Sequence, residues 1–349
     1  MPKLKVATKV ATLVTALAMG VVPAAMAANI SGAGATFPAP VYAKWAETYK
    51  AQTHNDLNYQ AIGSGGGIKQ INASTVDFGA SDKPLKPDAL AAGGLQQFPT
   101  VIGGVVPVMN LPGFQAGQIH MTGKLVSYIY QGTIKRWNDP AIQSWNKGLK
   151  LPNMPITVVH RSDGSGTSFL FTTYLSMSDP KWAAGPGGND AVNWPVGLGG
   201  KGSEGVTGIV KQNPGSIGYT ELNYAVNNHL PVARIQNKAG KWVTPTSAGA
   251  TAAIAAFSDA LAKDVRTPIV DPPASAPDAY PISGFTFLLI PKDGNNKANR
   301  QVLKSFVQYV ISDGQNQADA LDYSKLPDSV VQLDGTLLNE MTAQGQPLQ

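Results

Sequence analysis

The sequence predicts an α/β protein with two lobes. Short apolar segments of strand type alternate along the chain with segments that have the periodicity of helices, and this alternation is typical of an α/β sheet. The chain has 349 residues, more than one small core usually occupies. Apolar residues make up 43% of the chain and charged residues 14%, as expected for a folded protein.

The N-terminal 27 residues predict export. They comprise a basic start with Lys3, Lys5 and Lys9, an apolar run over residues 10–22, and the cleavage signal Ala25, Met26 and Ala27. The apolar run is too short to span a bilayer. We therefore expect residues 1–27 to be a cleaved signal peptide that sends a soluble protein to the periplasm, with a membrane anchor as the alternative.

Net charge and the content of cysteine and histidine argue against nucleic acids and metal ions as ligands. Without residues 1–27 the chain has 322 residues, and loss of three lysines lowers the net charge from +5 to about +2. This charge argues against a nucleic-acid-binding protein. Cysteine is absent, which excludes disulfides and thiolate metal sites. The four histidines form no close pair of the kind that binds zinc, so we expect neither a metal nor another cofactor.

The sequence predicts the following helices and strands. Helices are expected at residues 38–50 and 124–131 and from residue 169, and buried strands at residues 99–109, 156–159 and 285–290. In the first helix Val41, Trp45 and Tyr49 share one face. Gly132 follows the second and is expected to end it.

Three loops that lead into predicted helices are rich in glycine and hydroxyl groups. They are residues 31–37, 63–67 and 161–168. Free N–H groups and the positive end of the helix dipole make a helix start a suitable anion site, and Arg161 adds a guanidinium group. Any one of these loops alone is better explained by a tight turn with an N-cap. Because strands of an α/β sheet present such loops at one edge, the three together indicate a shared anion site.

The loops lack the patterns of several other functions. None has the spacing of a dinucleotide-binding or Walker sequence. No G-x-S-x-G sequence surrounds Ser64 or Ser165, so neither is predicted to be a hydrolase nucleophile. A catalytic triad assembled in space would escape this test, which leaves a secreted phosphatase as an alternative.

Seven motifs, in order along the chain, resemble those of the periplasmic phosphate-binding proteins of phosphate-specific ABC transporters. They lie at residues 32–40, 63–67, 77–82, 161–168, 197–202, 214–219 and 321–327. The resemblance implies a two-lobed periplasmic-binding-protein-like fold of type II, with the ligand in the cleft between lobes joined by two hinge crossovers. It places lobe one at residues 28–108 and 283–349, and lobe two at residues 109–282.

The resemblance also implies a set of phosphate-binding residues. They are Ala35, Thr36, Phe37, Ser64, Asp82, Arg161, Ser165, Gly166 and Thr167, with Asp163 behind them to orient Arg161. The alternative for Arg161 is a structural ion pair with Asp163. No catalytic residue is implied, and the protein is expected not to be an enzyme.

Asp82 has the most distinctive chemistry in this set. Phosphate keeps a proton near neutral pH and can donate it to a carboxylate, whereas sulfate has no proton to give. A site that hydrogen-bonds a ligand OH can reject the analogue without it by about 10⁴ to 10⁵. Taken alone, Asp82 is more simply a turn residue before Lys83 and Pro84.

The function that the resemblance implies is capture of inorganic phosphate and its delivery to an inner-membrane ABC permease with its ATPase. A monomer is expected. A receptor for another tetrahedral oxyanion is the closest alternative, because the same donors would hold it.

Overall fold

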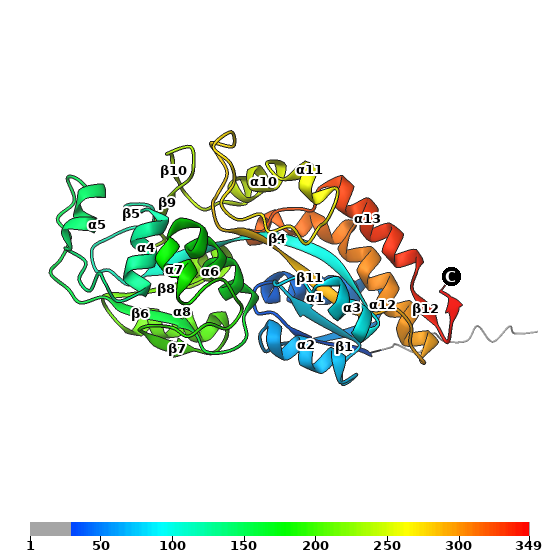
Figure 1. Cartoon of the computed structure of the whole chain (residues 1–349). Coiled ribbons are helices and arrows are strands. Elements are labelled where there is room, and N and C mark those ends of the chain that lie inside the picture. The colour runs from blue at the N-terminus through cyan, green and yellow to red at the C-terminus, as the bar shows by residue number, and fades with distance from the viewer. Residues whose placement is uncertain (1–28, 349) are drawn as a thin grey trace, which may run out of the picture.

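The computed structural model describes residues 29–348 and has two lobes connected by one mixed sheet (Figure 1). The predicted signal peptide at residues 1–27 lies outside the described residues. The long strand β4 (Leu95–Met109) runs from one lobe into the other. All of its residues are buried, which agrees with their nearly continuous apolar sequence.

The sheet has eight strands. In spatial order they are β2 (Asp56–Ala61), β1 (Asn29–Gly34), β3 (Phe78–Ser81), β11 (Ser283–Pro291), β4, β8 (Ser216–Glu221), β6 (Thr157–Arg161) and β7 (Leu198–Gly200). Strand β4 is antiparallel to both neighbours, pairing with β11 as far as Gly104 and with β8 from Val105 onward. On either side of this centre, β1 runs parallel to β2 and β3, and β6 runs parallel to β7 and β8.

Helices cover the sheet in both lobes (Figure 1). They are α1 (Ala39–Thr53), α2 (Ser64–Asn72), α3 (Pro87–Gly93), α4 (Gly123–Tyr130), α5 (Pro140–Trp145), α6 (Gly166–Ser178), α7 (Pro180–Ala184), α8 (Gly202–Gln212), α9 (Leu222–Asn227), α10 (Ser247–Ala255), α11 (Ser258–Leu261), α12 (Lys297–Val310) and α13 (Asp328–Asn339), with 3₁₀ helices at Asp313–Gln317 and Asp319–Leu321. Short strands β5 (His120–Met121), β9 (Arg234–Gln236) and β10 (Trp242–Val243) form a second sheet, and β12 (Thr342–Ala343) pairs with β13 (Gln346–Pro347).

The predicted helices and strands are present, most of them longer than expected. Helix α1 buries Val41, Trp45 and Tyr49 as its periodicity predicted. Helix α4 corresponds to the helix expected at residues 124–131. The three predicted strands are the cores of β4, β6 and β11, with β6 starting one residue later than expected.

Two helix starts were placed too late. Residues 64–67 were expected in a loop but form the first turn of α2. A Cβ on Gly67 would lie 2.5 Å from the Ala33 carbonyl oxygen, so glycine lets this helix lie directly against β1. Helix α6 begins at Gly166 rather than near Phe169. The end of the 161–168 loop is therefore the first turn of a helix, where N–H groups have no partner within the helix backbone.

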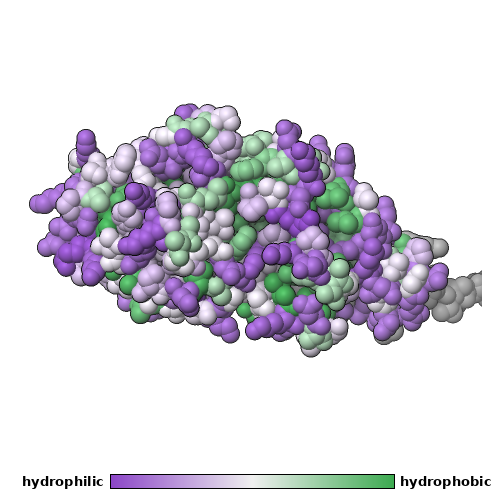
Figure 2. Space-filling view, viewed as in Figure 1, coloured by the Kyte–Doolittle hydropathy of each residue, from purple (hydrophilic) through white to green (hydrophobic). Residues whose placement is uncertain are grey.

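Apolar side chains of both lobes form one large buried cluster. Its tryptophans donate to backbone carbonyls: Trp45 to Gly314 and Trp137 to Gly215, at 2.8 and 2.9 Å. Hydrophilic residues are spread over both lobes on the face seen in Figure 2. Within residues 29–348, no helix combines the length and the apolar character that crossing a membrane requires.

Candidate anion-binding site

Four helices begin close together between the two lobes. Helices α1, α2, α6 and α8 follow strands β1, β2, β6 and β7, so their N-termini lie at the carboxyl ends of parallel strands. Contacts join the first turns across the lobes. Ser64 Oγ accepts from the Gly166 N–H at 3.1 Å, and Thr36 Oγ1 accepts from the Ser203 N–H at 3.2 Å. The N–H groups at these helix starts and the positive ends of the helix dipoles from both lobes thus converge on one place.

The turn before α1 presents a hydroxyl and two backbone amides. The Thr36 hydroxyl lies 2.8 Å from Ser203 Oγ, and the Thr36 carbonyl accepts from Tyr224 Oη at 3.0 Å. Among residues 29–348, no protein acceptor is found for the N–H of Thr36 or Phe37. Ala35 differs, because its N–H donates to the Ala80 carbonyl at 3.0 Å. Its amide, which we expected to bind the ligand, instead extends the pairing of β1 with β3.

Asp82 lies just beyond β3 and is buried, with 2% of its surface exposed. One carboxylate oxygen accepts from the Thr286 hydroxyl of β11. The other is 3.4 Å from Ser64 Oγ, which in turn accepts from the Asp82 N–H at 3.3 Å. The carboxylate is thus held in a fixed position and retains acceptor capacity, since each oxygen has two lone pairs.

The Asp82 carboxyl is poised to exchange a proton near neutral pH. Burial raises its pKa to about 7. The hydrogen bond from Thr286 opposes this rise, the charge of Glu221 adds to it, and the charge of Arg161 and the Ser64 hydroxyl oppose it. This carboxyl group can therefore meet a ligand proton with little cost in free energy.

Arg161 ends β6 and points its guanidinium into the same region. Nε and Nη2 bind the two oxygens of Asp163 at 2.7 and 2.5 Å, and Nη1 lies 3.4 Å from Thr167 Oγ1. Burial lowers the pKa of Arg161, but the hydrogen bond and charge of Asp163 and the charge of Glu221 outweigh it, so the pKa is raised. The ion pair with Asp163 that was the alternative for Arg161 is present, but it is buried rather than exposed, because the two side chains are only 2% and 14% exposed.

The first turn of α6 carries the remaining predicted residues. Ser165 caps the helix, its Oγ accepting from the Ser168 N–H at 3.0 Å, which leaves its own proton free to donate. Thr167 donates to a carboxylate oxygen of Glu221 at 2.5 Å. A Cβ on Gly166 would lie 2.5 Å from the Asp82 Cβ, so this position requires glycine for the helix to reach Asp82.

Several residues of the site were not predicted. Contacts with the predicted set are made by Ser203, Tyr219, Glu221, Tyr224 and Thr286. Glu221 ends β8 directly before α9, so the rule that pointed to the three glycine-rich loops could also have found it. Thr286 lies inside a buried strand, where no pattern in the sequence distinguishes it.

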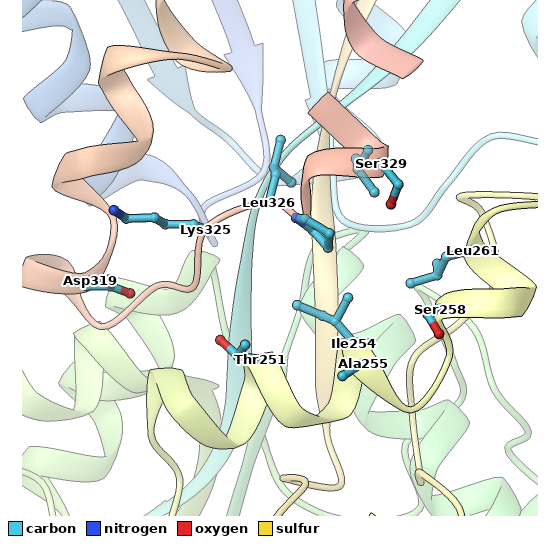
Figure 3. A pocket seen from close by; sticks show the side chains of 11 residues that line it. Thr251, Ile254, Ala255, Ser258, Leu261, Asp319, Lys325, Leu326 and Ser329 are labelled. Atoms are coloured by element: carbon cyan, nitrogen blue, oxygen red, sulfur yellow. The ribbon is translucent and has the colours of Figure 1, made fainter. Parts of the chain in front are cut away.

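A separate cavity of about 430 Å³ lies between α10, α11 and the start of α13 (Figure 3). Its walls include Ile254, Leu261 and Val330, and Lys325 and Asp319 lie at one side. None of the predicted ligand residues lines it. No cluster of three or more histidines or carboxylates suited to a metal ion occurs in the described part of the chain.

Comparison with known proteins identifies relatives over most of the chain. Residues 21–314 match the model of the PBP superfamily domain. The chain is 46% identical over 303 residues to the phosphate-binding protein PstS of Xylella fastidiosa, covering 87% of this chain and 83% of that protein. It is 46% identical over 308 residues to PstS of Pasteurella multocida, covering 88% of each. A crystal structure of a phosphate-binding protein from Stenotrophomonas maltophilia shares the fold, with a TM-score of 0.64, 21% identity, and coverage of 87% of this chain and 92% of that one.

Proposed function

Because the chain belongs to the PstS family of phosphate-binding proteins within the PBP superfamily, we propose that it is the phosphate receptor of an ABC transporter. It captures inorganic phosphate between its lobes and delivers it to an inner-membrane permease that works with an ATPase. The signal peptide at residues 1–27 directs it to the periplasm, where it acts as a monomer.

The two lobes close on phosphate about a hinge. We assign residues 28–108 and 283–349 to lobe one and residues 109–282 to lobe two. The change of partner along β4, from β11 to β8 after Gly104, supports a crossover in this strand. The second crossover lies at Ser283, where β11 begins. Closure that depends on ligand contacts from both lobes shifts the population toward the closed form.

The site holds the anion with donors from both lobes. The proposed donors are the N–H groups of Thr36, Phe37, Gly166 and Thr167, the hydroxyls of Thr36, Ser64, Ser165 and Thr167, and the guanidinium of Arg161. Ala35 shapes the turn, and Asp163 fixes the plane of Arg161. The Gly166 amide and the Ser64 hydroxyl are bonded to each other in this structure and would exchange that bond for the ligand.

Buried Asp82 is the observation that carries this proposal. A carboxylate at a site built from N–H groups, hydroxyls and an arginine repels an anion unless the anion brings a proton. Phosphate does so and sulfate does not. We therefore assign to Asp82 the selection of phosphate over sulfate, with a ratio in affinity of up to about 10⁴ to 10⁵ at a pH well above 7, where the group is ionised.

We propose binding without chemistry at this site. Ser64 is bonded to Asp82 and Gly166, and Ser165 caps α6. Neither hydroxyl is hydrogen-bonded to a histidine within the part of the chain that the structure describes, so neither has the partner that commonly activates a serine nucleophile.

Calorimetric titration with phosphate and then with sulfate tests the proposal. We expect heat and tight binding with phosphate and little or none with sulfate at the same concentration. Absence of phosphate binding, or equal affinity for sulfate, would overturn it. Release of phosphate from a chromogenic ester would instead support the phosphatase.

A further inference from the structure

Three consecutive backbone carbonyls in the turn before α1 each accept a hydrogen bond from a tyrosine hydroxyl. The pairs of carbonyl and hydroxyl are Ala35 with Tyr59 at 2.6 Å, Thr36 with Tyr224 at 3.0 Å, and Phe37 with Tyr323 at 2.6 Å. Tyr59 lies in β2 and Tyr323 precedes α13, whereas Tyr224 lies in α9, in the segment assigned to lobe two. Burial raises the pKa of each hydroxyl, so all three stay protonated and remain donors.

Two of these hydrogen bonds fix the direction of an amide N–H. Peptide bonds in the described part of the chain are trans, and the carbonyl and the N–H of a trans peptide point in opposite directions. The Ala35 carbonyl shares its peptide with the Thr36 N–H, and the Thr36 carbonyl shares its peptide with the Phe37 N–H. A hydroxyl that holds each carbonyl on one side therefore holds the following N–H on the other side.

These two N–H groups need an acceptor from outside the protein. Thr36 and Phe37 are buried, with 2% and 0% of their surface exposed, and no protein acceptor for either N–H is found among residues 29–348. A buried N–H group without a partner is unfavourable. Because the turn also lies at the positive end of the α1 dipole, an anion is the acceptor that it fits best.

The third hydrogen bond provides a contrast within the same turn. The Phe37 carbonyl shares its peptide with Pro38, whose nitrogen carries no proton. Tyr323 therefore fixes a peptide that presents no N–H, although its hydrogen bond is as short as that of Tyr59. The ring of Tyr323 packs against Phe37 and the ring of Tyr59 against Phe78, with centroids 6.0 Å apart in each pair. Phenylalanine at either tyrosine position would keep this packing and remove only the hydroxyl.

We propose that Tyr59 and Tyr224 are positioning residues for phosphate binding, which hold the Thr36 and Phe37 amides toward the ligand. The inference rests on the proposed function. Among the described residues no other donor to the Ala35 carbonyl is found. Without the Tyr59 hydroxyl this peptide can rotate, and its carbonyl oxygen then turns toward the anion and repels it. Tyr224 reaches the turn from lobe two, so its hydrogen bond also couples lobe closure to the direction of the Phe37 N–H.

Phosphate titration of three variants of the full mature protein tests this role. Tyr59→Phe should lower phosphate affinity by about tenfold. Because the Ala39 N–H also donates to the Thr36 carbonyl, at 3.2 Å, Tyr224→Phe should lower it by only about threefold. Tyr323→Phe is the matched control, since it also removes one hydroxyl from the turn, and should lower it by less than about twofold.

NMR of isotope-labelled protein assigns the effect to individual amides. In the wild type, the amide proton resonances of Thr36 and Phe37 should both shift strongly when phosphate binds. Tyr59→Phe should reduce the shift of the Thr36 amide, and Tyr224→Phe that of the Phe37 amide. Tyr323→Phe should change neither. A general loss of stability would not produce this pairing of each tyrosine with one amide.

The outcomes separate this inference from the proposed function. Equal loss of affinity in Tyr59→Phe and Tyr323→Phe, or unchanged amide shifts in both Tyr59→Phe and Tyr224→Phe, overturns the inference while phosphate binding persists. If Tyr59→Phe fails to fold, the Phe37 amide of Tyr224→Phe decides the question in the same way. Absence of phosphate binding by the wild type would instead reject the proposed function, and the inference with it.

Discussion

Two aspartates, Asp82 at the cleft and Asp334 in α13, are both buried but differ in their hydrogen-bond partners. They are 2% and 0% exposed. Asp82 accepts hydrogen bonds from Thr286 and Ser64, whereas neither Asp334 oxygen has a hydrogen-bond partner among the described residues. Burial is the main cause of a raised pKa in both, to about 7 for Asp82 and about 9 for Asp334.

The difference shows how a buried carboxyl becomes useful for binding. Donors that favour the charged form hold the pKa of Asp82 close to neutral, so the group can accept a ligand proton. Asp334 has burial alone and remains a neutral acid up to about pH 9. The second aspartate reduces stability as pH rises, whereas the proposed role of the first is to bind the ligand. Four substitutions test this contrast.

Asp82→Asn should have the largest effect. The amide keeps the shape of the side chain but loses the carboxylate acceptor, so phosphate loses a hydrogen bond and sulfate loses a repulsion. We expect the ratio of phosphate to sulfate affinity to fall by up to about 10⁴, or about 5.5 kcal/mol. Competition calorimetry measures this ratio. Asp334→Asn is the control and should keep it, while an unchanged ratio in Asp82→Asn contradicts the role of Asp82.

Asp334→Leu should stabilise the protein near neutral pH. In the unfolded chain Asp334 ionises at about its ordinary pKa of 3.8, but in the fold it stays protonated up to about 9. The folded state therefore binds more protons between these values, and its stability falls as pH rises through this range. Leucine has the same shape and no charge to bury. At pH 7 the gain in the free energy of unfolding should be about 4 kcal/mol.

Denaturation at about pH 5, 7 and 9 measures this gain. The stabilisation by Asp334→Leu should grow from the lowest to the highest pH. Asp328→Asn, at the exposed start of the same helix, is the control and should show no such trend. A constant difference at all three pH values would mean that Asp334 has a hydrogen-bond partner in solution.

The sequence predicted the loops of the candidate site better than it predicted the buried groups that change pKa values or stability. The loops at residues 31–37, 63–67 and 161–168 were recognisable because three of them, each with glycines and hydroxyls before a helix, occur in one α/β protein, although any one alone is explained by a tight turn. Thr286 and Asp334 were not recognisable. Their roles depend on which strand or helix packs against them, and this is decided by contacts between segments distant in the chain.

For the fold too, the sequence predicted local features better than those that depend on contacts between distant segments. Apolar runs and helical periodicity located β4, β11, α1 and α4, because these elements bury a continuous or regularly spaced set of side chains. The starts of α2 and α6 were missed, because glycines look like a loop when the backbone that they approach is unknown. The mixed order of the sheet, with β4 shared by both lobes, likewise depends on pairing between distant segments.

Thr286→Val should make Asp82 more like Asp334. It removes the hydrogen bond that most strongly favours the ionised form, so the pKa of Asp82 should rise above about 7. The loss should cost about 1 to 3 kcal/mol in the free energy of unfolding at a pH where Asp82 is charged. NMR titration of the aspartate carboxyl carbons reports the pKa. Ser81→Ala is the control, since its hydroxyl bonds Lys83 rather than Asp82; a rise in both variants would indicate a general change in packing.

Lys83→Met should have the smallest effect, although Lys83 is next to Asp82. Its ammonium reaches across to lobe two, binding Asp190 at 2.7 Å and Asn189 at 2.6 Å, but the paired side chains are 33% and 23% exposed. Exposed pairs contribute about 0 to 1 kcal/mol, so phosphate affinity should fall by less than about fivefold. Phosphate titration at low and high salt measures it, with Lys86→Met as a nearby control. A loss of more than about tenfold would mean that this contact, and not the buried carboxyl group alone, determines how firmly the lobes close.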